Sequence, residues 1–468
     1  VTNPMNLNYR FQPKDESRRE AADPVLEYFK GYYYLFASKS GGYWRSEDLA
    51  GWEYIPCTTI PTLEDYAPTI LPIGDTLYFT TSSGKTQIFK NAHPEKDTWE
   101  AVDTKLTYRL HDPAFYSDED GKVYMYWGCS DKDPIMGVEV DPKDGFRALG
   151  EAKALIAHHG DKYGWEVPGK NNEEPRQGWN EGPCMLKYEG RYYLQYAAPG
   201  TQYRIYGDGI YVGDTPLGPF EYVEDNPFSF KPGGFIGGAG HGHTFRDKYG
   251  NYWHVASMII SVRHMFERRL GLFPVAVSSR NGIYAHTVWS DYPFYIPNRK
   301  VDFDKTDLSM GWNLLSYRKP VQASSSLAGY EPGNANDEQI ETWWAAQTGK
   351  KGEWLQVDLE TPMLVNSIHV NFADHHFKVF APHPPVVYQF FIEGSADGKK
   401  WMNLFDEREN GKDEPHRLFT LDKPVKVRYL RICNAKEMDG CFSLSGFRVF
   451  GKGEGCLLYT SPSPRDIS

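Results

Sequence analysis

The sequence predicts an all-β protein in which a five-bladed β-propeller is followed by a C-terminal β-sandwich of the jelly-roll type. A phrase made of a polar residue, a short apolar run, a glycine turn and an aromatic strand recurs five times in the first 290 residues. Aromatic residues form 15% of the chain, and its 44 Gly and 32 Pro favour short strands and tight turns over helices. At 468 residues the chain is too long for one ordinary core, so two domains are expected.

Residues 1–20 are polar and rich in Arg and Glu, which indicates an entry strand or arm. The recurring phrase follows, and a multi-strand unit repeated every 40 to 70 residues is typical of a propeller blade. Its copies are ADPVLEYFKGYYYLFAS from Ala22, YAPTILPIGDTLYFTTS from Tyr66, HDPAFYSDEDGKVYMYWG from His111, NEGPCMLKYEGRYYLQYAA from Asn180 and GHGHTFRDKYGNYWHVAS from Gly240. We therefore predict five blades within a first domain that spans residues 1–296.

The residues that open the five copies are predicted to meet at one place. The first strand of each propeller blade lies nearest the central axis, so the entrances to these strands converge. The entrance residues with polar chemistry are Asp23, Asp112, Glu181 and His241. Asp-Pro is also a common turn starter, so a single copy would indicate only a turn. Three acids on blades one, three and four, together with a histidine, instead indicate a catalytic pit.

The ordered set Asp23-Pro24, Tyr66-Ala67-Pro68, His111-Asp112-Pro113, Glu181-Gly182-Pro183 and Gly240-His241-Gly242 resembles glycoside hydrolase family 43. Members of that family are five-bladed propeller enzymes of plant-polysaccharide breakdown, and the similarity covers about residues 20 to 290. The resemblance implies an inverting glycosidase in which Asp23 is the general base and Glu181 the general acid. It also implies that Asp112 tunes and orients Glu181.

Three further residues are assigned to substrate or ion binding. The resemblance implies that His241 holds a central ion or water, and that Arg268, within RRLGLFP, contacts the substrate sugar. Arg269 competes with Arg268 for this role because it is the adjacent cation. Trp179 directly precedes the Asn-Glu pair and is predicted to offer an aromatic face to a sugar, with a core position as the alternative.

The predicted chemistry makes demands on the three acids. Inversion needs a carboxylate to activate water and a carboxylic acid to protonate the leaving oxygen, about 6.5–9.5 Å apart. Glu181 must therefore be protonated near neutrality, which burial and an ionised Asp112 beside it would favour. Asp23 must stay ionised, so we expect it in a wetter or donor-rich setting.

The insertion at residues 158–179, HHGDKYGWEVPGKNNEEPRQGW, is polar and ends just before the predicted acid. Long loops at a channel mouth usually set specificity. We expect this loop to close the pit into a pocket, which favours release of a single terminal sugar over cleavage inside a chain.

After a linker at residues 297–312, short alternating strands over residues 313–452 predict the sandwich. Phrases such as WLQVDLETPMLVNSIHV and YQFFIEGSADGKKWMNL resemble the discoidin or coagulation factor 5/8 C-terminal domain, which includes carbohydrate-binding jelly rolls. The domain would either tether the protein to glycan through loop aromatics or only support the propeller. The candidate loop aromatics, which are expected to be exposed, include Trp343, Phe377 and Phe380.

The second resemblance also implies a structural calcium ion. Asp337, Thr342 and Trp344 fit the pattern D-x-x-x-x-T-x-W of the acidic loop that can hold it. Two departures weaken that assignment, because Glu338 replaces the usual Gly and Gly446 stands where a carboxylate ligand is common. Calcium at Asp337 is therefore a structural ion at most, and the predicted chemistry requires no cofactor.

The last residues belong to neither domain. CLLYTSPSPRD, within residues 456–468, resembles the translation of a transposase sequencing adapter and indicates a metagenomic fragment. The six cysteines show no metal-binding spacing, and only Cys433 and Cys441 are close enough in sequence to suggest a local disulfide. No signal peptide precedes Val1, so export rests on the predicted function, for which we expect a secreted or periplasmic protein whose upstream segment is missing.

Composition excludes several partners and leaves the sugar open. A net charge of -11 without a Lys/Arg cluster argues against nucleic acid, and the absence of a run of about 18 apolar residues argues against a membrane span. We predict an exo-acting glycosidase that releases α-L-arabinofuranosyl or β-D-xylosyl units from an oligo- or polysaccharide. The alternatives are a galactofuranosidase or galactosidase on the same scaffold, and a non-catalytic glycan-binding propeller.

Overall fold

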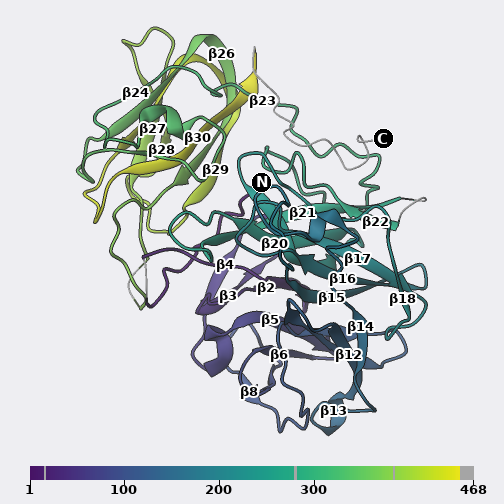
Figure 1. Ribbon diagram of the computed structural model, residues 1–468. Helices are drawn as coiled ribbons and strands as arrows, with labels where there is room; N and C mark the ends of the chain where they lie inside the picture. The colour runs from purple at the N-terminus through teal and green to yellow at the C-terminus, as the bar shows by residue number, and fades with distance from the viewer. Residues whose placement is uncertain (15–16, 279–281, 383–384, 454–468) are drawn as a thin grey trace.

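A computed structural model describes residues 1–14, 17–278, 282–382 and 385–453, and it confirms the all-β prediction (Figure 1). Five antiparallel sheets form a propeller, and a further sheet system forms the C-terminal sandwich. Over the described ranges, helical turns are limited to the short 3-10 segments η1 (Pro61–Glu64), η2 (Pro142–Asp144), η3 (Gly164–Glu166) and η4 (Pro332–Ala335). Within these same ranges no helix has the length and hydrophobicity needed to cross a bilayer.

Each blade is built from consecutive strands. Blade one contains β1 (Val25–Phe29), β2 (Tyr32–Phe36), β3 (Gly42–Ser46) and β4 (Glu53–Pro56), and blade two contains β5 (Tyr66–Ile73), β6 (Thr76–Ser82), β7 (Phe89–Asn91) and β8 (Glu100–Ala101). Blade three contains β9 (Ala114–Ser117), β10 (Val123–Trp127), β12 (Ile135–Asp141), β13 (Arg147–Ala148) and β14 (Lys153–Ile156). Blade four contains β15 (Asn180–Tyr188), β16 (Arg191–Ala198), β17 (Gly207–Gly213) and β18 (Phe220–Tyr222), to which β11 (Cys129–Ser130) adds. Blade five contains β19 (Gly237–Arg246), β20 (Tyr252–Ile259), β21 (Arg268–Ser278) and β22 (Gly282–Ala285).

The blades close into a ring because apolar side chains fill the space between neighbours. A separate buried cluster lies between each successive pair of blades, and the cluster between blades five and one also takes in Met5, Leu7 and Tyr9 of the N-terminal arm. The first strands β1, β5, β9, β15 and β19 pack side by side, and β19 returns to β1. Burial of each large apolar side chain contributes about 1.5–3 kcal/mol, so the high aromatic content stabilises the ring.

The entrance to each first strand has the same backbone conformation. The residues there have φ values of 50° at Asp23, 49° at Ala67, 49° at Asp112, 58° at Gly182 and 46° at His241. This left-handed region is uncommon for residues other than glycine. A shared, unfavourable bend at five places indicates that the ring holds these entrances in one geometry at one end of the axis.

Glu181 was expected to occupy the same blade-entrance position as Asp23 and Asp112, but it lies one residue before that position. The blade-four position that matches Asp23 and Asp112 is Gly182, which also precedes a proline as they do. Glu181 lies one residue earlier, where it pairs in register with Cys129 of β11. Glycine is required at 182 because a Cβ there would lie 2.5 Å from the imidazole of His241.

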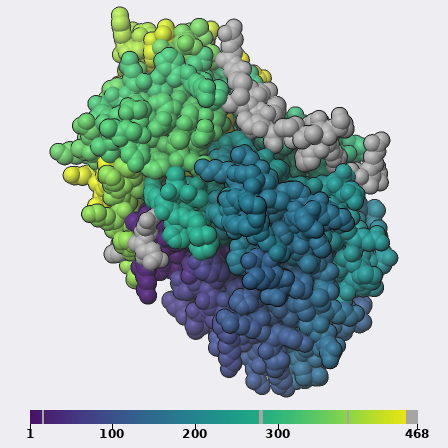
Figure 2. All heavy atoms as spheres, viewed as in Figure 1, coloured from purple at the N-terminus to yellow at the C-terminus, as the bar shows by residue number. Residues whose placement is uncertain are grey.

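The sandwich consists of β23 (Asn313–Leu314), β24 (Val321–Ala323), β25 (Trp344–Ala345), β26 (Trp354–Phe372), β27 (Phe390–Ser395), β28 (Met402–Asp406), β29 (His416–Asn434) and β30 (Ser443–Lys452). Its long strands β26 and β29 pair with each other along most of their length. The apolar side chains of both strands enter one core around Trp344, Phe372 and Phe442. Figure 2 shows the sandwich, in green and yellow, packed directly against the propeller, with the purple N-terminal residues at their junction.

The domain interface explains both departures from the calcium-loop pattern. Arg448 is buried and donates to both carboxylate oxygens of Glu338, at 2.7 and 2.9 Å, and to the carbonyl of Asp291 at 2.6 Å. Glu338 has a φ of 63°, the region that a glycine would favour, and it adopts this conformation while pairing with Arg448. Gly446 lacks a side chain where a Cβ would lie 2.8 Å from Phe235 of the propeller. Both positions therefore serve domain packing.

Replacing Glu338 with Gln should destabilise the protein strongly. The change leaves the buried guanidinium of Arg448 without its carboxylate, and breaking such a pair typically costs about 3–5 kcal/mol. Glu360→Gln is the matched control, because its partner Lys319 lies at the surface and exposed pairs contribute about 0–1 kcal/mol. Chemical denaturation of both variants measures the two losses, and equal losses would contradict a structural role for the Arg448 pair.

The loop aromatics of the sandwich are less available than we expected. The expectation that Phe377 is exposed is wrong, since its side chain is 5% exposed and joins the sandwich core. Trp343 donates through Nε1 to His375 at 3.1 Å, and its ring lies 5.3 Å from the guanidinium of Arg263 in the propeller. Phe380 is half-buried. These contacts favour a supporting role for this end of the domain over an exposed glycan platform.

Two smaller expectations concern the cysteines and the tail. All five cysteines in the described part of the chain are free, so the disulfide suggested for Cys433 and Cys441 is not formed. The adapter-like residues 456–468 lie outside the described residues.

Candidate active site

The four predicted entrance residues form one cluster. His241 Nδ1 lies 3.3 Å from Asp23 Oδ1 and 3.7 Å from Asp112 Oδ2, so both carboxyl groups face one edge of the imidazole. One ligand atom each of Asp112, Cys129 and Glu181 lie within 4.8 Å of one another. The propeller thus brings together side chains that are up to 218 residues apart in the sequence, from Asp23 to His241.

Asp23 is surrounded by donors. Ser38 Oγ donates to Asp23 Oδ2 at 2.6 Å, and Arg268 Nη1 donates to Oδ1 at 3.0 Å. The backbone N–H of Asp23 donates to Ser257 Oγ at 2.8 Å, which fixes the bend. Burial alone would raise the pKa of Asp23, but the charges of Arg268 and His241 and the hydroxyl of Ser38 hold it below its usual value. A buried and ionised carboxylate is suited to accept a proton from water.

Asp112 has fewer donors and behaves differently. Ser82 Oγ donates to its Oδ1 at 3.1 Å, and the Asp112 backbone N–H donates to the same hydroxyl at 2.6 Å. Burial raises the pKa of Asp112 to about 7, assisted by the charges of Glu181 and Asp23 and opposed by His241. The direction of this shift opposes the ionised state that was expected for Asp112. Asp112 can therefore carry a proton near neutrality.

Glu181 accepts hydrogen bonds from two residues that our reading of the motifs did not include. Tyr206 O–H donates to Oε1 at 2.5 Å, and the Cys129 thiol donates to Oε2 at 3.2 Å. Burial and the neighbouring carboxylates raise the pKa of the Cys129 thiol, which keeps it a donor. Neither residue opens a blade, so the repeat alone could not identify them. The pairing of β11 with β15 across blades three and four brings Cys129 to the site.

A buried aspartate fixes the fifth entrance. Asp208 accepts from the backbone N–H groups of His241 at 2.7 Å and Gly242 at 2.9 Å, and its Oδ2 lies 2.9 Å from His254 Nε2. Burial would lower the pKa of His241, but Asp23, Asp112 and the other nearby acids raise it above its usual value. This favours a cationic imidazole, which is a poor metal ligand. The axial ion at His241 remains a prediction.

The two adjacent arginines of β21 have different environments. Arg268 is 2% exposed and reaches Asp23, whereas Arg269 Nε donates to His416 Nε2 in the sandwich at 2.8 Å. Arg268 is therefore the member of the pair that belongs to the site. Its contact with a sugar remains a prediction. Trp179 is 39% exposed, so its ring is available at the surface, and its stacking role is likewise a prediction.

The insertion at residues 158–179 is anchored by one buried acid. Glu166 accepts from Tyr196 O–H at 2.5 Å and from the backbone N–H of His159 at 2.6 Å. Tyr163 stacks on Tyr222 with ring centroids 3.6 Å apart. These contacts tie the loop to blade four beside the Glu181 entrance, and closure of the pit by this loop remains a prediction.

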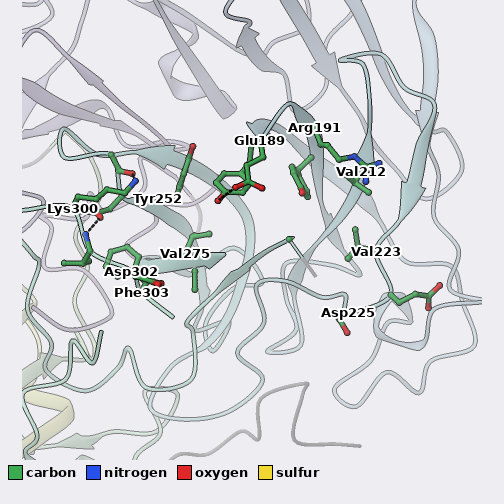
Figure 3. A pocket seen from close by; sticks show the side chains of 18 of the residues that line it. Glu189, Arg191, Val212, Val223, Asp225, Tyr252, Val275, Lys300, Asp302 and Phe303 are labelled. Atoms are coloured by element: carbon green, nitrogen blue, oxygen red, sulfur yellow. Dashed lines mark hydrogen bonds between the residues drawn. The ribbon is translucent and has the colours of Figure 1, made fainter. Parts of the chain in front are cut away.

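A large cavity lies away from these acids. This space has a volume of about 820 Å³. Figure 3 shows residues that line it, among them Glu189, Tyr252 and Lys300. Glu189 directly follows β15, and Glu181 lies near the start of that strand, so the cavity is about 25 Å from the predicted acid along the chain. It therefore belongs to the opposite end of the blades.

The residues around Asp337 fit calcium poorly. The carboxylate of Asp337 accepts from Thr342 Oγ1 at 2.7 Å and from the Gln339 N–H at 3.0 Å, and Glu338 is paired with Arg448. Calcium in proteins takes six to eight oxygen ligands, usually with several carboxylates. Asp337 joins no group of three possible metal-binding side chains among the described residues.

A second group of possible ligands consists of His375, His376 and Cys441, with one ligand atom of each within 4.8 Å of the others. The two imidazole rings stack with centroids 3.9 Å apart and an interplanar angle of 26°, so their lone pairs lie in nearly parallel planes. His375 Nδ1 already accepts from Trp343. This group is better described as packing than as a metal centre.

Replacing Asp112 with Asn should stabilise the protein at neutral pH while impairing the site. The pKa of Asp112 rises from 3.8 to about 7 on folding, so the folded state binds more protons than the unfolded state between these values. The free energy of unfolding therefore falls as pH rises through this window, and Asn removes that loss. We expect the free energy of unfolding of the Asn variant, relative to that of the parent, to be roughly 1–4 kcal/mol higher at pH 8 than at pH 4. Chemical denaturation across this range measures it, and a difference that does not change with pH would contradict the assignment.

Comparisons with known proteins agree with this geometry. The profile of the family described as Glycosyl hydrolases family 43 matches residues 17–278, and the profile of the F5/8 type C domain matches residues 320–444. These matches confirm both resemblances drawn from the sequence. A curated relative, Beta-D-galactofuranosidase xynD of Aspergillus niger, is 24% identical over an alignment of 234 positions that covers 42% of this chain and 62% of that protein. The chain thus spans less than two thirds of this relative.

Two solved structures share the fold. One, titled "Glycoside hydrolase", is 19% identical, with a TM-score of 0.52 over 95% of this chain and 99% of the other. The other, a thermostable family-43 glycoside hydrolase, is 21% identical, with a TM-score of 0.51 over 64% of this chain and all of the other, at 100%. The first likeness spans both domains and the second covers little more than the propeller.

Proposed function

Because the chain belongs to glycosyl hydrolases family 43, we propose that it is an inverting, exo-acting glycosidase that releases terminal α-L-arabinofuranosyl or β-D-xylosyl units from plant polysaccharide. The observation that carries the proposal is the contrast between its acids. Asp23 is held ionised by Arg268 and Ser38, while the pKa of Asp112 beside Glu181 rises to about 7. One base and one proton source around a single pit are what inversion requires.

In the proposed reaction Asp23 accepts a proton from a water molecule as that water attacks the anomeric carbon. The bond from this carbon to the leaving oxygen breaks on the opposite face, and Glu181 gives that oxygen a proton. Glu181 is more exposed than the neighbouring Asp112, so it is the acid placed to reach the leaving oxygen. His241 stays between Asp23 and Asp112 and offsets their repulsion.

A second candidate function is galactofuranosidase activity on the same scaffold. The curated Aspergillus niger relative is named a Beta-D-galactofuranosidase, which supports a five-membered sugar ring as the substrate. A non-catalytic glycan-binding propeller is less well supported, because a lectin has no need for a base and a proton donor in one pit. An enzyme acting on polysaccharide would work outside the cytoplasm, and we propose a secreted or periplasmic location.

A panel of nitrophenyl glycosides tests the activity and separates these candidates. We expect measurable kcat/KM on the α-L-arabinofuranoside or the β-D-xyloside, and little on the galactoside. Highest turnover of the β-D-galactofuranoside would favour the second candidate. Binding of sugars without turnover of any member would support the lectin and contradict the proposal.

A further inference from the structure

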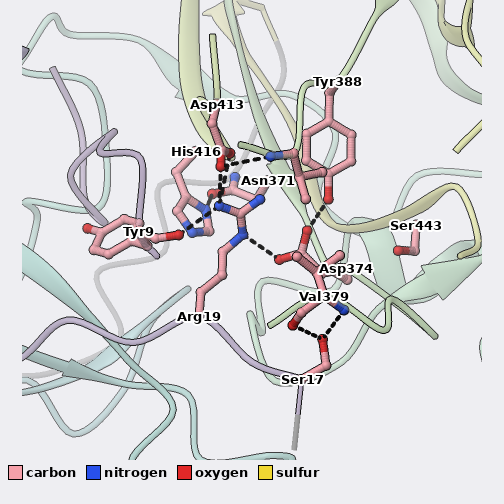
Figure 4. Close-up of polar contacts among 12 residues, drawn as sticks. Tyr9, Ser17, Arg19, Asn371, Asp374, Val379, Tyr388, Asp413, His416 and Ser443 are labelled. Atoms are coloured by element: carbon pink, nitrogen blue, oxygen red, sulfur yellow. Dashed lines mark hydrogen bonds and ion pairs between the residues drawn. The ribbon is translucent and has the colours of Figure 1, made fainter. Parts of the chain in front are cut away.

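The N-terminal arm connects the sandwich to the candidate site through two adjacent side chains. Arg19 is fully buried; its Nε donates to Asp374 Oδ2 at 2.8 Å and its Nη1 to the Asp413 carboxylate at 2.9 Å. Figure 4 shows its guanidinium between these two sandwich acids, with the hydroxyl of Tyr388 also donating to Asp374. Two acidic residues of the sandwich thus hold the N-terminal arm of the propeller domain in place.

The next residue of the arm turns to the opposite side. Glu20 is also fully buried, and its Oε1 accepts from Arg268 Nη2 at 3.0 Å. The other end of that guanidinium, Nη1, donates to Asp23 Oδ1 and to Thr201 Oγ1, each at 3.0 Å. Successive side chains of an extended segment point to opposite faces, which explains how Arg19 reaches the sandwich while Glu20 reaches the site.

Strand β21 repeats the same alternation. Arg269 follows Arg268 and donates through Nη1 to the carbonyl of Arg19 at 3.0 Å and through Nε to His416 of the sandwich at 2.8 Å. The arm and β21 therefore contact each other in two places, one facing the candidate site and one facing the sandwich. One is the buried set Glu20–Arg268–Asp23, and the other ties both strands to the sandwich.

We propose that Glu20 is a positioning residue that acts through Arg268 on Asp23, and that the sandwich anchors it by burying Arg19 between Asp374 and Asp413. The inference rests on the base role proposed for Asp23. Glu20 occupies one end of the guanidinium, so Asp23 binds only the other end through Oδ1. Its Oδ2 accepts from Ser38 and keeps a second lone pair for water. Without the charge of Glu20, Asp23 is the one carboxylate left on Arg268, and the closer pairing draws it away from its water-activating position.

Several charged or titratable groups surround Asp23 and Glu20. They are Arg18 of the arm, Tyr66 of β5, Asp112 before β9, Tyr206 before β17, His241 of β19 and Arg268 of β21. Glu20 is the nearby carboxylate that shares Arg268 with the base. Removing its negative charge makes the surroundings of Asp23 more positive, which lowers the pKa of Asp23. Asp23 then stays ionised, and able to act as a base, down to a lower pH.

Glu20→Gln tests the proposal, because it removes the charge and keeps the shape. In the full chain, on the nitrophenyl glycoside that the parent hydrolyses best, we expect kcat to fall about 10- to 100-fold with KM changed less than about threefold. The acidic limb of the kcat/KM profile should move to lower pH. A variant that was only less stable would lose active protein without moving that limb. An unchanged kcat and an unchanged limb would overturn the proposal.

Asp374→Asn tests the anchor and keeps the proposal falsifiable if Glu20→Gln fails to fold. It should lower kcat by about threefold or more, because a less firmly held Arg19 loosens the arm. Asp358→Asn is the matched control, since it removes the partner of Arg428 in a partly exposed ion pair of the same domain and should leave kcat unchanged. Equal kcat in both variants would overturn the anchoring role.

The Asp23→Asn variant separates this inference from the proposed function. If Asp23→Asn is inactive and Glu20→Gln has the parent's kcat and pH profile, the positioning role is wrong and the base assignment stands. If Asp23→Asn retains the parent's kcat, the base assignment itself fails.

Discussion

Glu181→Gln is expected to lower kcat by about 10²- to 10⁴-fold on a substrate with a poor leaving group. Gln cannot give a proton to the departing oxygen, and its side chain has nearly the size of the carboxyl group that Tyr206 and Cys129 contact in the parent. An aryl leaving group of low basicity needs little protonation, so the loss should shrink as the leaving group improves. Steady-state kinetics on a series of substituted phenyl glycosides measures this trend.

Glu189→Gln is the control for this experiment. Glu189 directly follows β15 at its far end, on the same strand that carries Glu181, and its side chain is exposed. We expect the parent's kcat for every substrate. A loss in Glu181→Gln that is the same for good and poor leaving groups would contradict the assignment of Glu181 as the general acid.

Asp23→Asn is expected to lower kcat by a similar factor, about 10²- to 10⁴-fold, and by the same amount for all leaving groups. The amide cannot accept a proton from water, whereas departure of the leaving oxygen still has its proton donor. Arg268 and Ser38, which donate to Asp23 in the parent, would meet an amide of the same size. Added azide, which needs no deprotonation, should restore turnover by attacking the anomeric carbon and forming a glycosyl azide.

The control for the base is Asp75→Asn, in the β5–β6 turn of blade two. The Asp75 side chain is 95% exposed and its one ion pair, to Lys30, is long at 3.9 Å. Its kcat should equal that of the parent. Parent-like turnover by Asp23→Asn without azide would show that another group activates the water.

The sequence predicted much of the fold because each blade repeats the same local pattern. The phrase that begins at Asp23 and recurs at Asp112 encodes a bend, a strand and a glycine turn, and these are decided by nearby residues. Convergence at the axis then follows from ring closure. The same reasoning placed Glu181 one position away from its true place in the repeat, because the copies were aligned by their acidic residues. The backbone bend instead recurs at the residue before proline, which in blade four is Gly182.

Contacts between distant segments could not be predicted in this way. Cys129 and Tyr206 reach Glu181 from a bridging strand and an inter-strand loop, and neither position has a repeated signal. Glu338 and Gly446 looked like departures from a calcium loop until the propeller surface beside them was known. The identity of such residues is determined by contacts with distant segments, which the local sequence does not reveal.

The most direct test of the account is the anomeric configuration of the first sugar released, followed by proton NMR on the best nitrophenyl glycoside before mutarotation. Attack by a water activated at Asp23, opposite the oxygen protonated by Glu181, predicts a sugar of inverted configuration. Release of the sugar with its original configuration would require a covalent intermediate on one carboxylate, and would contradict the roles assigned to both residues.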